Sequence, residues 1–221
     1  MSYHAVIFDM DGVLVDSEPA FFEAVNDVLV PTGKRVEWEQ YQRLLLGTSI
    51  SATWAGVLEM LDLQAEDVQP YVDRYGDALL EVLRRPRPLL PGVEALIGDL
   101  KRRGVPIGLA TSSRQAWVEA LLGAADLPLA TFDALAWREM VERGKPAPDL
   151  YLKAAELVGV MPERCIAVED TPAGIASAKA AGMYAVQSRA ASSAFPPIKE
   201  ADLVIDALAE FPIELVTTAQ G

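Results

Sequence analysis

The chain has 221 residues, 51% of them hydrophobic and 23% charged, which suits one sizeable domain or a domain with a smaller companion. Its 32 Asp and Glu against 19 Lys and Arg give a formal net charge of -13, which argues against a nucleic-acid-binding protein, because such binding depends on clustered Lys and Arg. No run of 18 apolar residues is present, which argues against a membrane span, and the opening residues lack a secretory signal pattern, so we expect a cytoplasmic location.

The first predicted strand ends in two carboxylates. In "AVIFDMDGVLVDSEP" (residues 5–19) an apolar run is followed by Asp9 and Asp11. Side chains two residues apart in an extended segment point to the same side, so these carboxylates project together and repel each other. Burial makes the repulsion worse unless one group is protonated or a cation lies between them. The pair therefore indicates either a metal site or proton-transfer chemistry.

Residues 17–86 form a different kind of segment. Apolar residues recur there at helical spacing, and no convincing strand interrupts them. We therefore expect an all-helical domain at 17–86, inserted into a second domain that comprises 1–16 and 87–221. Asp16 to Pro19 and the proline-rich 85–92 are expected to act as hinges at its two ends.

From residue 88 onward, short apolar runs alternate with helical patterns, which predicts parallel βαβ units with helices on both faces of a sheet. The fold class is therefore α/β. Thr171 and Pro172 predict a capped helix start. The predicted strands are 105–111, 132–137, 165–170, 183–187 and 202–206, and the predicted helices are 114–124, 147–160 and 172–182.

Polar side chains follow several of these strands. In parallel sheets, ligands bind beyond the carboxyl ends of the strands, so these residues are expected to share one rim. Each has a structural explanation when taken alone, as a helix cap, an exposed turn or a neutraliser of a helix dipole. Their occurrence together favours a functional site. The residues are Asp9 and Asp11, then Thr111, Ser112 and Ser113, then Lys145, then Glu169 and Asp170.

The single cysteine and the single histidine give little support to other chemistry. Cys165 begins an apolar run, which predicts a buried, unreactive thiol. His4 lies at the start of the first strand, away from the end that carries the aspartates. A serine or cysteine triad that uses histidine as its base is therefore poorly supported.

Taken together, the strand-end residues make the chain resemble the haloacid dehalogenase superfamily of phosphotransferases. "DMDGVLVDSE" matches the first family motif, Thr111 the second, Lys145 the third, and the Glu169-Asp170 pair the fourth. "KPAPDLYLKAAELVGV" and "EDTPAGIASAKAAGM" resemble the β-phosphoglucomutase-like branch, which consists mostly of sugar-phosphate phosphatases. The resemblance implies a Rossmann-like core with an inserted helical cap domain at 17–86.

The resemblance also implies roles for the motif residues. Asp9 would be the nucleophile that forms an aspartyl-phosphate, and Asp11 the acid and then the base. Thr111, Ser112 and Lys145 would hold the phosphoryl group, and Gly12 would permit the turn after the acid. The cofactor would be Mg²⁺, bound by Asp9, Asp170 and the Asp11 carbonyl, with Glu169 a direct or an indirect partner.

Two departures from the family pattern favour hydrolysis over phosphoryl transfer within a sugar. Where the best-known mutase of this branch has a histidine in its cap, this chain has Phe21 or Phe22. Where that enzyme has an arginine for a second phosphate, this chain has Ile50, and loss of such a contact disfavours retention of a bisphosphate. We therefore expect a phosphatase; the alternatives are a mutase or a non-catalytic binding module.

Cap residues are expected to select the substrate, a small phosphorylated metabolite such as a sugar phosphate. Aromatic cap residues also fit a packing role, and "GTS" also fits a loop that joins two helices. The candidates are Phe21, Phe22, Gly47, Thr48, Ser49 and Trp54, of which we select Phe21, Thr48 and Ser49 as substrate-binding residues. Carbon–halogen hydrolysis is disfavoured because Asp11 is present. Phosphonate cleavage would need a Schiff-base lysine, and Lys34 is the only lysine of the cap. We expect a monomer.

Overall fold

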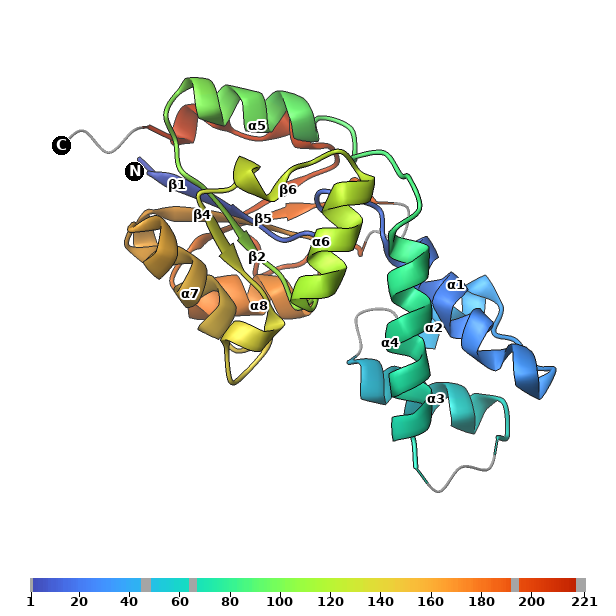
Figure 1. Cartoon of the computed structure of the whole chain (residues 1–221). Coiled ribbons are helices and arrows are strands. Elements are labelled where there is room, and N and C mark those ends of the chain that lie inside the picture. Colours follow the sequence, from blue (N-terminus) through green and yellow to red (C-terminus); the bar gives the residue numbers. More distant parts are fainter. Residues whose placement is uncertain (1, 45–48, 64–66, 192–194, 218–221) are drawn as a thin grey trace. The chain divides into compact units, whose positions relative to one another are not determined.

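The computed structural model describes residues 2–44, 49–63, 67–191 and 195–217, and it divides the chain into two compact units (Figure 1). The first unit combines Met1–Asp16 with Pro86–Gly221, and the second is Ser17–Arg85. The second unit is therefore inserted into the first after the first strand.

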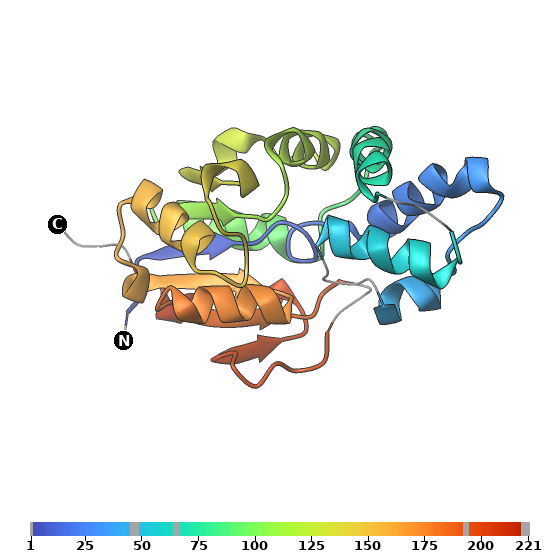
Figure 2. The same cartoon turned by 90° about the horizontal axis from the view of Figure 1, so that it is seen from below.

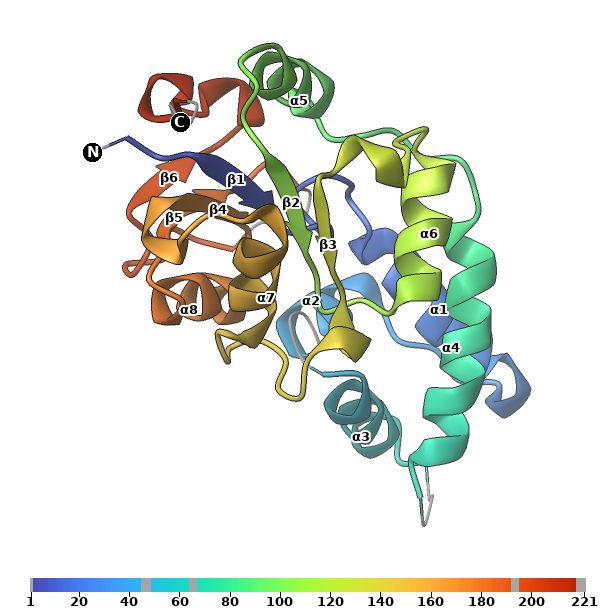
Figure 3. The ribbon, with the colours of Figure 1, turned by 60° about the vertical axis from the view of Figure 1, so that its left-hand side comes forward.

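The first unit contains a parallel sheet of six strands in the order β3-β2-β1-β4-β5-β6 (Figure 3). β1 lies in the middle, β2 and β3 extend the sheet on one side, and β4, β5 and β6 extend it on the other. This arrangement confirms the predicted α/β fold. The strands are β1 (Ala5–Phe8), β2 (Ile107–Ala110), β3 (Ala134–Ala136), β4 (Cys165–Glu169), β5 (Tyr184–Ser188) and β6 (Leu203–Ile205).

Helices cover both faces of this sheet, which explains why the central strands are continuous apolar runs. α7 (Asp149–Val158) and α8 (Pro172–Ala180) lie on one face, and α5 (Val93–Arg102) lies on the other (Figure 1). β1, β2 and β4 are buried at every position. The remaining helix of this unit, α6 (Gln115–Ala124), follows β2.

The predicted elements of the first unit agree with the observed ones in type and, within about two residues, in position. The helix cap predicted at Thr171 is present, since its Oγ1 accepts a hydrogen bond of 3.0 Å from the Gly174 amide. Helix α5 was not predicted. Its signal was available, because Val93, Leu96, Ile97 and Leu100 recur at helical spacing and are all buried.

The regular secondary structure in the described residues of the second unit is helical (Figure 2). Its helices are α1 (Glu18–Leu29), α2 (Trp38–Leu44), α3 (Ile50–Met60) and α4 (Gln69–Leu83), and α1 packs against α4. Trp54 is fully buried and contacts the rings of Tyr71 and Tyr75. No helix in the described ranges is long and apolar enough to cross a membrane.

Cys165 begins β4, and its side chain is fully buried, as predicted. Burial, with a further contribution from the charge of Glu163, raises the pKa of the thiol to about 12. A thiolate is the reactive form of cysteine, so the folded protein should protect this group chemically as well as sterically.

We therefore predict that Cys165 reacts with a thiol reagent such as DTNB at least about a hundredfold more slowly in the native protein than in 6 M guanidinium chloride at pH 8. The absorbance of the released thiolate measures both rates. Because Cys165 is the only cysteine of the chain, no other residue contributes to the signal. Comparable rates in the two solvents would contradict the buried placement.

Candidate active site

The two central strands end where the chain order of the sheet reverses. β1 pairs with β2 on one side and with β4 on the other, so residues that follow β1 and β4 lie at this switch point. Asp9 follows β1 directly, and its amide donates a hydrogen bond of 2.9 Å to the Val168 carbonyl of β4. Crevices of this kind bind ligands in open α/β sheets.

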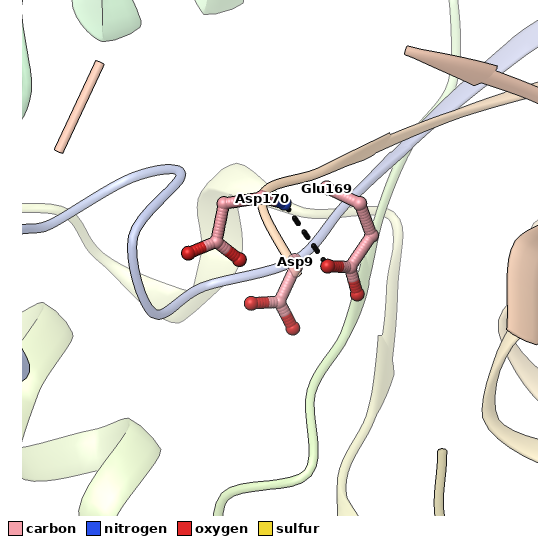
Figure 4. A group of neighbouring side chains, drawn as sticks. All are labelled: Asp9, Glu169 and Asp170. Carbon is pink, nitrogen blue, oxygen red and sulfur yellow. Dashed lines mark hydrogen bonds between the residues drawn. The ribbon is translucent and has the colours of Figure 1, made fainter. Parts of the chain in front are cut away.

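Three buried carboxylates meet at this point (Figure 4). Asp9, Glu169 and Asp170 are exposed by only 6%, 1% and 8%, and each offers a carboxylate oxygen within 4.8 Å of the others. Burial of several like charges is unfavourable unless cations accompany them. The structure thus brings together three of the four residues that the sequence predicts as metal ligands.

Lys145 supplies one positive charge to this cluster. Its Nζ donates to Asp9 Oδ1 at 2.6 Å, to Glu169 Oε1 at 2.5 Å and to the Ala110 carbonyl at 2.8 Å. An ammonium group has three N–H donors, so all three are used. The side chain is only 6% exposed, which makes these strong, charge-assisted hydrogen bonds.

A tight turn after β1 brings the backbone close to the acidic cluster. The Gly12 amide donates to the Val15 carbonyl at 2.8 Å, and Gly12 has a φ of 76°, which favours glycine. A Cβ atom at this position would collide with the Asp170 carboxylate. Glycine is therefore required both by the turn and by the side chain packed against it.

The Asp11 side chain is not part of the three-carboxylate cluster and contacts the loop after β2. Its Oδ2 accepts a hydrogen bond of 2.8 Å from the Ser113 hydroxyl. The Ser113 amide in turn donates to Thr111 Oγ1 at 3.0 Å, and both of these loop residues are buried, whereas the Ser112 side chain is exposed. The loop after β2 thus holds the second aspartate of the first motif.

Glu169 is held by the start of the next helix. Its Oε2 accepts from the Asp170 amide at 3.0 Å, from the Thr171 amide at 3.3 Å and from the Thr171 hydroxyl at 3.2 Å. A Cβ atom at Gly174, in the first turn of α8, would overlap this carboxylate. The donors of Asp170 and Thr171, and the space left at Gly174, therefore hold the Glu169 carboxylate in place.

Burial dominates the electrostatics of the site. It raises the pKa of Asp9 to about 8, although the Lys145 ammonium limits the rise. It also raises the pKa of Asp170 well above its usual value, and the charges of Glu169 and Asp9 add to the effect. Burial disfavours the charged form of Lys145, but Asp9 and Glu169 more than offset this and raise its pKa.

The residues present fit a hard divalent cation. Asp170 Oδ1 is buried and has no hydrogen-bond donor among the described residues, so its lone pairs are available to a cation. Three carboxylates against one ammonium also leave excess negative charge when all are ionised. Oxygen ligands of this kind suit Mg²⁺.

The substrate-binding residues predicted in the second unit can be placed only in part. Ser49 caps helix α3, since its Oγ accepts a hydrogen bond of 3.3 Å from the Ala52 amide. Phe21 is half-buried on α1. Thr48 lies outside the described residues. Their predicted contact with substrate stays a prediction.

Two contacts of the site were not predicted from the sequence. Ser113 lies at a predicted strand end, but the sequence does not indicate that its hydroxyl reaches Asp11. Tyr151 falls within the predicted helix 147–160, where the sequence gives it no role, yet its hydroxyl donates to Glu169 Oε1 at 3.0 Å. Burial raises the pKa of Tyr151 well above its usual value, so this hydroxyl stays protonated.

Comparison with known proteins identifies the class to which this fold and site belong. The model of a family of hydrolases, the haloacid dehalogenase-like hydrolases, matches residues 3–182. Hexitol phosphatase B of Escherichia coli is 35% identical over 182 residues, which cover 82% of each protein. Beta-phosphoglucomutase of Bacillus subtilis is 31% identical over 220 residues, which cover 96% of this chain and 93% of that enzyme.

A solved structure is similar over nearly the whole chain. CbbY from Rhodobacter sphaeroides, determined with phosphate and, as a mutant, with xylulose-(1,5)bisphosphate, is 28% identical and superposes with a TM-score of 0.81 over 95% of this chain and 96% of that one. Another relative is much longer: the match spans 17% of the SUPPRESSOR OF QUENCHING 1 protein of Arabidopsis thaliana. This chain belongs to the haloacid dehalogenase-like hydrolases, and the predicted enzyme class, a phosphatase of this family, is confirmed.

The electrostatics of the site predict how metal removal affects stability. A carboxyl whose pKa is raised by folding binds its proton more tightly in the folded state, so unfolding releases protons between its ordinary pKa, about 4, and the raised value. The metal-free protein should therefore lose stability as the pH rises across this range. Mg²⁺ should restore it, by about 2.7 kcal/mol at a concentration of 100 Kd.

Thermal unfolding with EDTA or with Mg²⁺, at pH 5 and at pH 8, measures this effect. We expect a larger rise in melting temperature on addition of Mg²⁺ at pH 8 than at pH 5. The Asp170→Asn variant should lose the rise, and the Asp206→Asn variant, whose carboxylate is exposed, should keep it. An equal rise in wild type and Asp170→Asn would rule out this cluster as the metal site.

Proposed function

We propose that this protein is an Mg²⁺-dependent phosphatase that hydrolyses a small phosphorylated carbohydrate through an aspartyl-phosphate formed on Asp9. The observation that carries the proposal is the buried group of Asp9, Asp170, Glu169 and Lys145 at the switch point of the sheet. Phosphoryl transfer needs a nucleophile, neutralisation of oxygen charge and a proton for the leaving group. Residues suited to each of these tasks converge there.

Asp9 suits the role of nucleophile. Lys145 contacts its Oδ1, and among the described residues no hydrogen bond involves its other carboxylate oxygen. That oxygen would attack phosphorus, forming an Asp9–phosphorus bond while the bond to the sugar oxygen breaks. Water would then displace the carboxylate and release inorganic phosphate.

Asp11 would provide the proton. In its protonated form it would donate to the departing sugar oxygen, and as the resulting carboxylate it would accept a proton from the attacking water. Its hydrogen bond to Ser113 shows that the loop after β2 can hold this side chain. Thr111, Ser112 and Lys145, together with the turn at Gly12, would surround the phosphoryl oxygens.

Asp9, Asp170 and the main-chain carbonyl of Asp11 would hold Mg²⁺. When bound, the ion would neutralise charge on these carboxylates and on the phosphoryl group. Glu169 belongs to the same cluster, but both of its oxygens already accept hydrogen bonds, which favours the indirect role: it would set the position of Lys145 beside the metal ligands.

The substrate class rests on the relatives and on the departures from the mutase pattern. One relative is a hexitol phosphatase, and the superposed CbbY mutant binds a sugar bisphosphate. The only histidine, His4, precedes β1 at the end opposite Asp9, and Ile50 begins α3. We therefore favour hydrolysis, with residues 17–86 as a cap in which Phe21, Thr48 and Ser49 contact the sugar, in a monomeric, cytoplasmic enzyme.

The test is release of inorganic phosphate from a panel of sugar phosphates, short phosphorylated acids and nucleotides. We expect Mg²⁺-dependent release from one or more sugar phosphates. The Asp9→Asn variant should lower turnover by at least about a thousandfold, because covalent transfer is then blocked. The Asp206→Asn variant serves as the matched control, and acid-quenched wild type should carry a phosphoryl group on the peptide that contains Asp9.

A second assay separates hydrolysis from transfer. The similarity to the Bacillus subtilis mutase makes phosphomutase the second candidate. Conversion of glucose 1-phosphate to glucose 6-phosphate in the presence of a bisphosphate primer, without phosphate release, would replace our proposal with a mutase. Mg²⁺ binding without turnover in either assay would favour a binding module.

A further inference from the structure

Tyr151 has no role in the proposed reaction, yet it contacts Lys145 and Glu169, which both have one. It is on α7, and its side chain is fully buried. Its hydroxyl donates to Glu169 Oε1 at 3.0 Å, and its ring centroid lies 4.9 Å from Lys145 Nζ. One side chain thus contacts both partners of the Lys145–Glu169 ion pair.

The hydrogen bonds of Lys145 show why this contact matters for phosphoryl binding. All three N–H donors are used, by Asp9, Glu169 and the Ala110 carbonyl. If the ammonium binds a phosphoryl group, as proposed above, it must give up one acceptor. Asp9 is the acceptor at which the phosphoryl group arrives, so Glu169 and Ala110 remain to hold the lysine.

Glu169 can hold the lysine only if its own Oε1 stays in place. Backbone and Thr171 donors hold Oε2, whereas Oε1 accepts from Lys145 and Tyr151. Among the described residues, the Tyr151 hydroxyl is the one donor besides Lys145 that reaches Oε1. When Lys145 releases Asp9, this hydroxyl therefore opposes a swing of Oε1 about the anchored Oε2. The ring face adds a cation–π attraction to the ammonium.

We infer that Tyr151 is a positioning residue: its hydroxyl fixes Glu169 Oε1 so that Lys145 keeps its place while it binds the phosphoryl group. This inference rests on the proposed function for the role of Lys145. Packing alone does not need the hydroxyl, because the neighbouring core positions of α7, Leu150, Ala154 and Ala155, are apolar, and phenylalanine would fill the same volume.

The Tyr151→Phe variant tests the inference, since it keeps the ring and removes only the hydroxyl. Tyr184→Phe is the matched control, because it makes the same change at the start of β5, opposite the site. Three quantities are compared with wild type: kcat and KM on the preferred substrate, Mg²⁺ affinity by calorimetry, and hydrogen exchange of the Lys145 ammonium. The last is read from its ¹⁵N resonance, assigned by its absence in Lys145→Arg.

In Tyr151→Phe we expect faster exchange of the Lys145 ammonium and a kcat lower by about ten- to a hundredfold, which corresponds to one hydrogen bond to a charged group. KM should change by less than about twofold, because the contact matters most as charge develops in the transition state. Mg²⁺ affinity should stay the same, because Asp9 and Asp170 are unchanged. Tyr184→Phe should resemble wild type in all three.

Unchanged ammonium exchange in folded Tyr151→Phe would overturn the inference, and so would an unchanged kcat in an active enzyme. An equal loss of kcat and Mg²⁺ affinity would also overturn it, because it would indicate a general disturbance of the site. Failure of the proposed function shows itself differently: wild type would then release no phosphate, while the exchange measurement would still report whether Tyr151 holds Lys145.

Discussion

One buried ammonium group faces three buried carboxylates, and the rest of the site depends on this imbalance. Lys145 lies between Asp9 and Glu169, while Asp170 has a buried oxygen that no described donor reaches. Such a cluster lowers the free energy of unfolding, because buried charges lose their hydration without full compensation. The cluster lies at the switch point of the sheet, where the proposed cation would supply the missing positive charge.

The backbone makes the cluster possible at two glycines. Gly12 turns the chain after β1 in a left-handed conformation beside the Asp170 carboxylate, and Gly174 leaves room for the Glu169 carboxylate at the start of α8. A side chain at either position would displace an acidic group. The two glycines therefore help to set the positions of the acidic side chains, because each leaves the space that one carboxylate occupies.

The two carboxylates of the first motif lie in different surroundings, as their proposed roles require. Asp9 is buried beside Lys145, whereas Asp11 accepts a hydrogen bond from Ser113 in the loop after β2. Two carboxyl groups in different environments can take the roles of nucleophile and acid. Glu169 contributes differently, since its saturated hydrogen bonds make it a fixed charge that orders Lys145.

The sequence alone determined the α/β fold class, because parallel strands and helices have distinct apolar periods. It also predicted the helical insertion and the strand-end residues, because the motifs place acids directly after strands. It missed helix α5, although apolar spacing indicated it. Only the tertiary structure decided that Ser113 reaches Asp11 and that Tyr151 reaches Glu169. Hydrogen bonds between residues 102 or 18 positions apart depend on how strands and helices pack, and a serine in a loop or a tyrosine on an apolar helix face carries no local signal of its partner.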